Sequence, residues 1–411
     1  MCLVKLRGVR GFVEKQSHNY RIILVRSAGA NFLMNLTRNY FSIYTTGLGA
    51  DAVTLGGIRS VSSAVNMLIS IPSGWLSDNY NLKKVMGVGM AIQVVMVAIL
   101  ALARNWTWVF VSMALDPFTM ALMFRSQTVM MSNALNDGDR ATGFGLRQVF
   151  GQLVGITAPI PAALIVGHFG GLNVEGIRPL FYLRTIGLVI LYAYVYTRLD
   201  DAHPQPRAEK SSVLQDVREV LAGGKRLRTW IVVSGLGSIG WGMMEPFTFL
   251  YAAEVKGADA LILGLMTTVS VFASITLSLP VNQIADTRGR KFAVFLIRPA
   301  LYIWMIMVVL APSPSWLILA WVFRGIGLST TAYDTIALEL VPSHQRGRWL
   351  GITNAFSSIA RIPAPLIGGL LYRGKHSYLI FLIPLILDLK LRMPLLRWKI
   401  PETSKSPTQE N

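Results

Sequence analysis

The chain has 411 residues, of which 53% are hydrophobic and only 15% are charged, and its mean hydropathy is +0.48. Soluble domains carry about 25% charged residues, so this composition excludes an ordinary soluble domain and indicates a membrane protein. The formal net charge of +18 would suit a nucleic-acid-binding protein, but the positions of the basic residues argue against that class.

Apolar stretches of roughly 20 residues recur along the chain, and this is the length that a helix needs to cross about 30 Å of hydrocarbon. We therefore expect an all-α membrane protein with twelve transmembrane helices. Their expected ranges are 24–46, 52–74, 83–103, 107–132, 142–167, 179–198, 229–252, 258–281, 290–311, 315–338, 347–372 and 376–396. The first twenty residues hold no apolar core, so no cleavable signal peptide is expected.

The basic residues predict the topology. If the N-terminus is cytoplasmic, most Lys and Arg residues fall on the cytoplasmic side, whereas the opposite side receives Arg104, Arg178, Lys256, Arg373 and Lys375. This asymmetry follows the positive-inside rule and predicts a multi-pass protein of the cell membrane with both termini in the cytoplasm. The net charge then reflects topology, so a lipid bilayer is the expected partner and nucleic acid is not.

Cysteine and histidine usage predicts neither a disulfide nor a metal site. Cys2 is the single cysteine, so no intrachain disulfide can form, and the five histidines are scattered without metal-ligand spacing. We expect no metal and no cofactor.

An internal repeat divides the chain. The stretch "GADAVTLG" at 49–56 returns as "GADALILG" at 257–264, a shift of 208 residues. Further matches follow at shifts of 208 and then 206: Pro72 with Pro280, Asp78 with Asp286, Lys83 with Lys291, Arg140 with Arg346, and Ala158-Pro159 with Ala364-Pro365. We therefore expect two pseudo-symmetric six-helix bundles, at 1–199 and 229–411, the second ending in a short cytoplasmic tail.

A cytoplasmic linker is expected at 200–228. It begins with the polar, Pro-containing "DDAHPQPRAEK" and continues as "SSVLQDVREVLAGGKR", in which apolar residues line one helical face after the possible cap Ser212. This pattern predicts either a helix at the membrane surface or an ordinary linker helix packed on the loops.

Two loop sequences resemble a known family. "GWLSDNYNLKK" (74–84) follows the second expected helix, and "NQIADTRGRK" (282–291) follows the eighth. The second resembles the cytoplasmic loop signature of the major facilitator superfamily, Gly-x-x-x-Asp-(Arg/Lys)-x-Gly-Arg-(Arg/Lys). It matches that signature at Asp286, Gly289, Arg290 and Lys291, whereas the first copy keeps Gly74, Asp78 and Lys83 but has Asn81 and Leu82 where Gly and Arg are usual.

The resemblance implies a fold and a gate. "ELVPSHQRGRWLG" (339–351) is similar to the family's loop between helices 10 and 11. The family fold implies twelve helices around a central cavity lined by helices 1, 4, 7 and 10, with 5 and 11 beside it. The loop charges then form a cytoplasmic gate that holds the two halves together in one state and releases them in the other. Its expected members are Gly74, Asp78, Lys83, Asp286, Gly289, Arg290, Lys291, Glu339 and Arg346.

Polar stripes at bilayer depth mark the expected substrate site. Both repeats place them on equivalent helices. Helix 1 carries Asn31, Asn35, Arg38 and Ser42, and its equivalent, helix 7, carries Ser234, Ser238, Trp241 and Glu245. Helix 5 carries Gln148, Gln152 and Gly155, and its equivalent, helix 11, carries Asn354, Ser358 and Arg361. The expected substrate-binding residues are Asn31, Asn35, Arg38, Gln148, Gln152, Trp241, Glu245, Asn354 and Arg361. The amides have an alternative role in hydrogen bonding between helices.

Charged pairs on helices 4 and 10 are ambiguous. Asp116 and Arg125 lie nine residues apart and so on opposite sides of their helix, and Arg324 and Asp334 present the same difficulty. Asp116 is nearer the midplane. We expect either Glu245 or Asp116 to be the proton-coupling residue, because a lone carboxyl in a partly dry cavity can exchange protons.

These observations predict a monomeric secondary transporter rather than an enzyme. The glycine-rich "GLGSIG" (235–240) lies inside an apolar span and lacks the strand that a dinucleotide site requires. Without a nucleotide site, coupling to protons, by symport or antiport, is the natural energy source. Arg38, Arg361 and Arg324 suggest that the small-molecule substrate is an organic anion. The alternatives are a drug-type exporter and a membrane sensor that binds a ligand without transporting it.

Overall fold

The computed structural model describes residues 11–13, 15–136, 139–201, 224–341 and 346–402, and for residues 70–79, 125, 141 and 346–348 only the backbone. Within these residues the ordered elements are helices. Eight segments are long and apolar enough to cross a membrane, and the remaining four expected spans fall on helices that are interrupted near their middle or contain charges. The described residues agree with the all-α membrane fold expected from the sequence.

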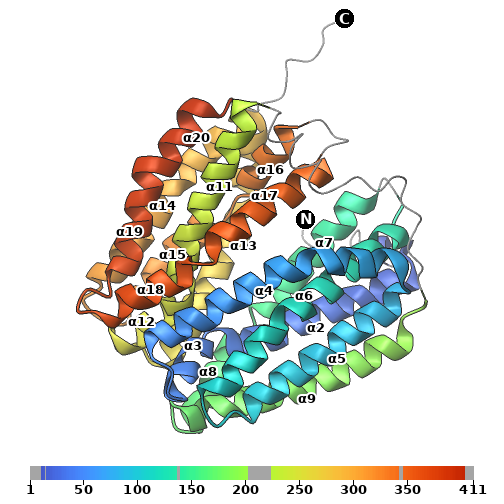
Figure 1. Cartoon of the computed structure of the whole chain (residues 1–411), viewed down its shortest axis with the longest axis horizontal. Coiled ribbons are helices and arrows are strands. Elements are labelled where there is room, and N and C mark those ends of the chain that lie inside the picture. Colours follow the sequence, from blue (N-terminus) through green and yellow to red (C-terminus); the bar gives the residue numbers. More distant parts are fainter. Residues whose placement is uncertain (1–10, 14, 137–138, 202–223, 342–345, 403–411) are drawn as a thin grey trace, which may run out of the picture.

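Two bundles make up the molecule (Figure 1). The N-terminal half consists of α2 (His18–Arg38), α3 (Phe41–Gly47), α4 (Ala52–Asn79), α5 (Leu82–Ala101), α6 (Trp106–Ala134), α7 (Arg140–Gly155), α8 (Pro159–His168) and α9 (Val174–Arg198). The C-terminal half consists of α11 (Lys225–Met244), the 3-10 helix η2 (Glu245–Phe247), α12 (Thr248–Glu254), α13 (Ala260–Arg288), α14 (Arg290–Leu310), α15 (Trp316–Gly327), α16 (Ala332–Glu339), α17 (Arg346–Arg361), α18 (Ala364–Arg373), α19 (Leu379–Leu387), the π-helix η4 (Asp388–Arg392) and α20 (Met393–Lys399). The expected linker helix lies outside the described residues.

Several spans are broken near their middle, mostly at proline. Pro159 begins α8, Pro363 precedes α18, and Pro246 interrupts helix 7 at η2. Proline has no backbone N–H and its ring clashes with the preceding turn, so the regular helix stops there. Helix 1 breaks without a proline at Asn39, whose side-chain amide donates to the carbonyl of Leu263 in the other half, 3.1 Å away. The freed backbone groups lie where the halves meet.

The repeated "GADA" sequence builds the same turn twice. Gly49 and Gly257 adopt φ angles of +93° and +70°, which favour glycine. Asp51 and Asp259 then cap α4 and α13, each accepting a 2.8 Å hydrogen bond from the backbone N–H three residues on. Hydrogen bonds from Thr54 lower the pKa of Asp51 below its usual value. We call the end of the molecule that carries these two turns the hairpin end.

The last glycine of each repeat packs one half against the other. Gly56 of α4 lies against the Pro365 backbone at the start of α18, and Gly264 of α13 lies against the Pro159 backbone at the start of α8. A methyl group at Gly264 would come within 2.8 Å of the carbonyl oxygen of Pro159. The "GADA…G" motif of each half therefore contacts the Ala-Pro motif of the other half. From this closed hairpin end the two bundles diverge toward the opposite end, where α7 and α17 begin (Figure 1).

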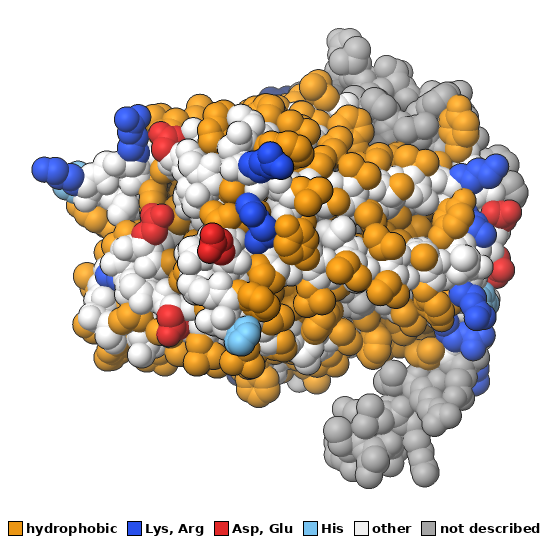
Figure 2. Space-filling model, turned by 90° about the horizontal axis from the view of Figure 1, so that it is seen from below, with side chains coloured by type: hydrophobic (Ala, Val, Ile, Leu, Met, Phe, Trp, Pro, Cys, Tyr) orange, Lys and Arg blue, Asp and Glu red, His pale blue; other side chains and the backbone are white. Residues whose placement is uncertain are grey.

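The outer surface is apolar in a band. Figure 2 shows one face of the molecule, on which hydrophobic side chains lie between the charged groups at one end and those nearer the other end. Large apolar residues on helices of both halves are about two-thirds exposed, for example Ile190, Phe272 and Leu310. Such a surface is suited to lipid, because a water-facing surface of this composition would drive association.

Candidate functional site

A cavity of about 390 Å³ lies between the two halves, and we call it the central cavity. The N-terminal half contributes residues of α2, α3, α4 and α7, and the C-terminal half contributes residues of α11 to α15, including η2. Its polar and aromatic lining includes Asn31, Asn35, Arg38, Asn39, Ser42, Arg59, Gln152, Trp241, Glu245, Thr248, Thr267, Ser270, Ser274, Trp304 and Arg324. The lining thus includes α4, α13 and α14, which are helices 2, 8 and 9 of the expected twelve and lie beyond those that the family resemblance implied.

Six of the expected substrate-binding residues line this cavity: Asn31, Asn35, Arg38, Gln152, Trp241 and Glu245. Two of them also serve helix packing. The Asn35 side-chain amide donates to the carbonyl of Gly155 on α7 at 3.2 Å, and that of Asn31 donates to Ser27 within α2 at 2.8 Å. Gly151 and Gly155 leave room for these two amides. The hydrogen bond between helices that the sequence left open is therefore present for Asn35, whereas the bond from Asn31 stays within α2.

Three arginines surround the central cavity. Arg38 is exposed at the end of α2. Arg59 of α4 lies over the Phe41 ring at 4.4 Å, and its Nε is buried without a hydrogen-bond partner among the described residues. Arg324 of α15 lies 5.5 Å from the ring centres of both Trp241 and Trp304. Guanidinium groups stacked on aromatic rings keep their in-plane N–H donors for a ligand.

Glu245 forms an ion pair with Arg361 of α17. Both side chains remain about two-fifths exposed, so the pair faces open space rather than a packed core. Glu245 lies where helix 7 changes from α11 to η2, which turns its carboxylate toward α17. It is therefore not the lone carboxyl that the sequence suggested, because Arg361 of another helix pairs with it.

A second cavity, of about 290 Å³, lies on the other side of this ion pair. Asp116, Arg361 and Ser358 line it, and it shares Arg59 and Glu245 with the central cavity. Asp116 thus faces a cavity at the junction of α4, α6 and α17, as its position near the midplane suggested. The side chain of Arg125 lies outside the described residues.

Two expected residues lie away from both cavities. Gln148 on α7 and Asn354 on α17 are exposed one helical turn from Gln152 and Ser358, toward the end opposite the hairpin end. They continue the polar stripes without lining either cavity. The stripes therefore run from the cavities toward the open end of the molecule.

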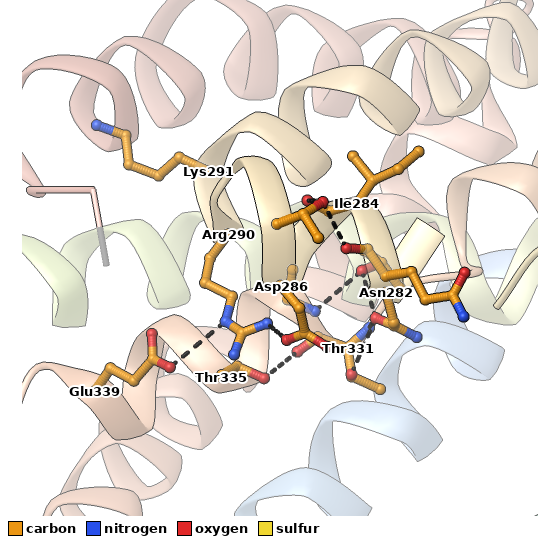
Figure 3. A network of polar contacts seen from close by, with 12 residues as sticks. Asn282, Ile284, Asp286, Arg290, Lys291, Thr331, Thr335 and Glu339 are labelled. Atoms are coloured by element: carbon orange, nitrogen blue, oxygen red, sulfur yellow. Dashed lines mark hydrogen bonds and ion pairs between the residues drawn. The ribbon is translucent and has the colours of Figure 1, made fainter. Parts of the chain in front are cut away.

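The loop signature forms a charged network in the C-terminal half (Figure 3). Arg290 pairs with Asp286 one turn earlier and with Glu339 of α16, with 3.5 Å between its Nε and the Glu339 carboxylate. Asn282 occupies the position where the family prefers glycine, and its side-chain oxygen accepts from the Thr330 hydroxyl at 2.9 Å and from the Thr331 N–H at 3.1 Å. These contacts join α13, α14 and α16 within one half.

The end of the signature fastens the last helix. Gly289 adopts a φ of +113°, and Lys291 Nζ donates to the carbonyls of Arg397 and Ile400 at 2.9 and 2.8 Å. The Glu402 carboxylate accepts from the Lys291 backbone N–H at 2.8 Å. A cation at the C-terminal end of α20 and an anion at the N-terminal end of α14 both suit the helix dipoles.

The first copy of the signature is built differently. Asn81, where the family has glycine, has a φ of −55° and caps α5 by accepting from the Lys83 N–H at 2.9 Å. Lys83 Nζ lies 5.3 Å from the centre of the Tyr196 ring. Gly74 and Asp78 belong to α4 and Arg346 begins α17, and for these three residues the structure describes only the backbone.

Several cavity residues escaped the sequence analysis, and Arg59 is the most consequential. It is an arginine within an expected span, and a charge at bilayer depth is costly enough to be a signal by itself. Thr267, Ser270 and Trp304 carry no comparable signal, because hydroxyl groups and tryptophans are common in transmembrane helices.

Comparison with known sequences identifies the family. A sequence model of the Major Facilitator Superfamily matches residues 27–365 and 257–410. In Bacillus subtilis (strain 168), the uncharacterized MFS-type transporter YqjV is 23% identical over 363 residues, covering 85% of each chain. The uncharacterized MFS-type transporter YhjO of the same strain is 28% identical over 170 residues, covering 41% of this chain and 42% of its own length. The match to YhjO therefore spans about two-fifths of that relative.

Solved structures agree on the fold. A mutant of the nucleoside transporter NupG superposes with a TM-score of 0.76 at 14% identity, covering 92% of this chain and 99% of its own. A POT family transporter in complex with a thioalcohol-conjugated peptide gives 0.69 at 16% identity, covering 93% and 96%. With two helical bundles, paired loop signatures and a cavity between the halves, the chain belongs to the major facilitator superfamily of transporters.

Proposed function

We propose that this chain is a secondary transporter that moves a small organic anion across the membrane by alternating access, coupled to protons. The observation that carries the proposal is the charge of the central cavity. Arg38, Arg59 and Arg324 line it, and among its described lining residues the sole carboxylate, Glu245, is already paired with Arg361. A cavity with this excess of guanidinium groups attracts anions and binds carboxylates through paired N–H donors.

The Glu245–Arg361 ion pair supplies a route to proton coupling. A proton on Glu245 removes the negative charge that holds Arg361, and the released guanidinium can then bind the anion. Proton binding and anion binding would support each other, which is the linkage that a symporter needs. Asp116, beside Arg59 in the second cavity, is the other candidate carboxylate.

The interface between the halves supports alternating access. The close helix contacts lie at the hairpin end, through Gly56 with Pro365 and Gly264 with Pro159, and the bundles diverge at the other end. Because the same contact occurs twice in reversed order, a rocking of one half against the other can open both at once. The two broken helices contact each other beside the cavity, because Asn39 lines it and the Ser42 hydroxyl donates to the carbonyl of Pro246.

Uptake into proteoliposomes tests the function. A panel of labelled small carboxylates is offered under an imposed pH gradient, and Arg38→Gln is compared with Arg104→Gln, an exposed loop residue. A charge-assisted hydrogen bond contributes about 1.5–3 kcal/mol, so we expect at least a tenfold loss of uptake for Arg38→Gln and none for the control. Normal uptake by Arg38→Gln contradicts the proposal. Accumulation of hydrophobic cations alone would indicate a drug-type exporter, and binding without accumulation would indicate a sensor.

A further inference from the structure

A second charged cluster lies inside the C-terminal half, apart from the central cavity. Asp388 of η4 accepts hydrogen bonds from Arg298 Nε at 2.8 Å, from the Tyr302 hydroxyl at 2.6 Å and from Arg392 Nη1 at 3.1 Å, with a further contact from Arg298 Nη2. Asp388 and Arg392 are 7% and 9% exposed. The π-helix places Asp388 and Arg392 together on the side of the twelfth span (α19, η4 and α20) that faces α14 and α11.

The charges in this cluster do not balance. Two guanidinium groups share one carboxylate, and its two oxygens already accept four hydrogen bonds, so it has no capacity for another donor. Each guanidinium carries five N–H donors, and the contacts to Asp388, together with the 3.0 Å bond from Arg392 Nε to the Val233 carbonyl, use two of each. One positive charge is therefore left over at bilayer depth, where an uncompensated charge is costly.

A cavity of about 280 Å³ adjoins the cluster, and we call it the C-terminal cavity. Arg298, Asp388 and Arg392 line it, and they are the charged residues of its described lining. The rest of the lining is mainly apolar, with Gly237 and Gly240 opening the α11 side and Tyr333 beside Arg392. It meets the central cavity only through the shared residues Trp241, Met244 and Leu328.

Among the described residues, the corresponding contact in the other half has no carboxylate and an arginine beside it. Where α5 packs on α9, the contact that corresponds to α14 against helix 12, the Tyr192 hydroxyl donates to the Gln93 side chain. The Arg26 guanidinium lies 5.9 Å from the centre of the Tyr192 ring. The C-terminal half has two arginines at the corresponding contact, and both line a cavity, which favours a ligand-binding role.

We propose that the C-terminal cavity binds one small monovalent anion, a halide or a short carboxylate, between Arg298 and Arg392. One excess positive charge matches one negative charge, whereas a phosphate or a dicarboxylate would leave a buried negative charge. The apolar walls also suit an anion that sheds its water readily. This inference does not depend on what the central cavity transports.

Purified full-length protein tests this by thermal unfolding in sodium bromide, chloride or acetate, with sodium gluconate replacing them at constant ionic strength. We expect a saturable rise in Tm with the small anions in the unmodified protein and in Arg38→Gln, and its loss in Arg298→Gln. In Arg298→Gln the Asp388–Arg392 pair is kept and the cluster becomes neutral, so the variant should still fold. Competition between acetate and bromide should show that both anions occupy the same site.

Crystals grown in bromide give an independent measurement on the unmodified protein. We expect an anomalous scattering peak in the C-terminal cavity, in contact with Arg298 or Arg392. A bromide peak confined to the central cavity, no peak in either cavity, or an equal rise in Tm for Arg298→Gln would each overturn the proposal.

Discussion

At the scale of residues, the site depends on which charges find partners across helices. Sequence spacing placed Arg38, Trp241, Glu245 and Arg361 on stripes that face the interface, and all of them line a cavity. Spacing within a helix cannot show which residue of another helix comes close. The pairing of Glu245 with Arg361, and the position of Arg59 between the two cavities, follow from how α4, α11 and α17 meet.

Replacing Glu245 by Gln tests the coupling role of this pair. The amide mimics a permanently protonated carboxyl and leaves Arg361 without its counter-charge, so the anion should bind at least tenfold more tightly. Uptake should persist but lose its stimulation by a pH gradient. Counterflow in proteoliposomes with and without a gradient measures both effects.

Asp116→Asn is the matched variant for that test, because Asp116 lies in the neighbouring cavity and forms no ion pair with another described residue. If only Asp116→Asn loses gradient stimulation, coupling belongs to Asp116. Full stimulation in both variants would show that neither carboxylate carries the coupling proton.

At the scale of elements, the repeat predicted more than the periodicity did. Hydropathy located the spans but could not show that helix 1 breaks at Asn39, since no proline or glycine marks that position. At the break the Asn39 side-chain amide donates to the carbonyl of Leu263, a partner in the other half. The repeated glycines, in contrast, signalled close contacts that recur in both halves.

Substituting Gly56 by Leu should prevent the hairpin end from closing. The side chain would collide with the Pro365 backbone, which cannot move aside as a flexible side chain can. Overpacking of this kind costs about 1–3 kcal/mol, enough to change a balanced conformational equilibrium roughly tenfold or more. We expect transport to fall sharply while anion binding is retained.

The neighbouring Gly57 provides the control, because nothing lies within 4 Å of the position where its side chain would begin. Gly57→Leu should transport normally and express to the same level. If Gly56→Leu and Gly57→Leu transport equally well, the α4–α18 contact is not part of the conformational cycle.

At the scale of the whole molecule, the two ends differ in how they expose the path between the halves. At the hairpin end Ser42 is 7% exposed and its hydroxyl donates to the carbonyl of Pro246, 2.5 Å away. Toward the opposite end Gln148 and Asn354 are exposed. From the positive-inside rule we predict that the open end lies in the cytoplasm and that this conformation faces inward.

Cysteine labelling can test this assignment, because Cys2 is the only cysteine and Cys2→Ser yields a cysteine-free chain. In that background a membrane-impermeant maleimide should label Gln148→Cys and Asn354→Cys from the cytoplasmic face and leave Ser42→Cys unlabelled. Adding Gly56→Leu should reverse the pattern, exposing Ser42→Cys to the external face and slowing the reaction at Gln148→Cys. Unchanged rates at both ends would mean that the halves do not exchange access, because a rocking motion that opens one end must close the other.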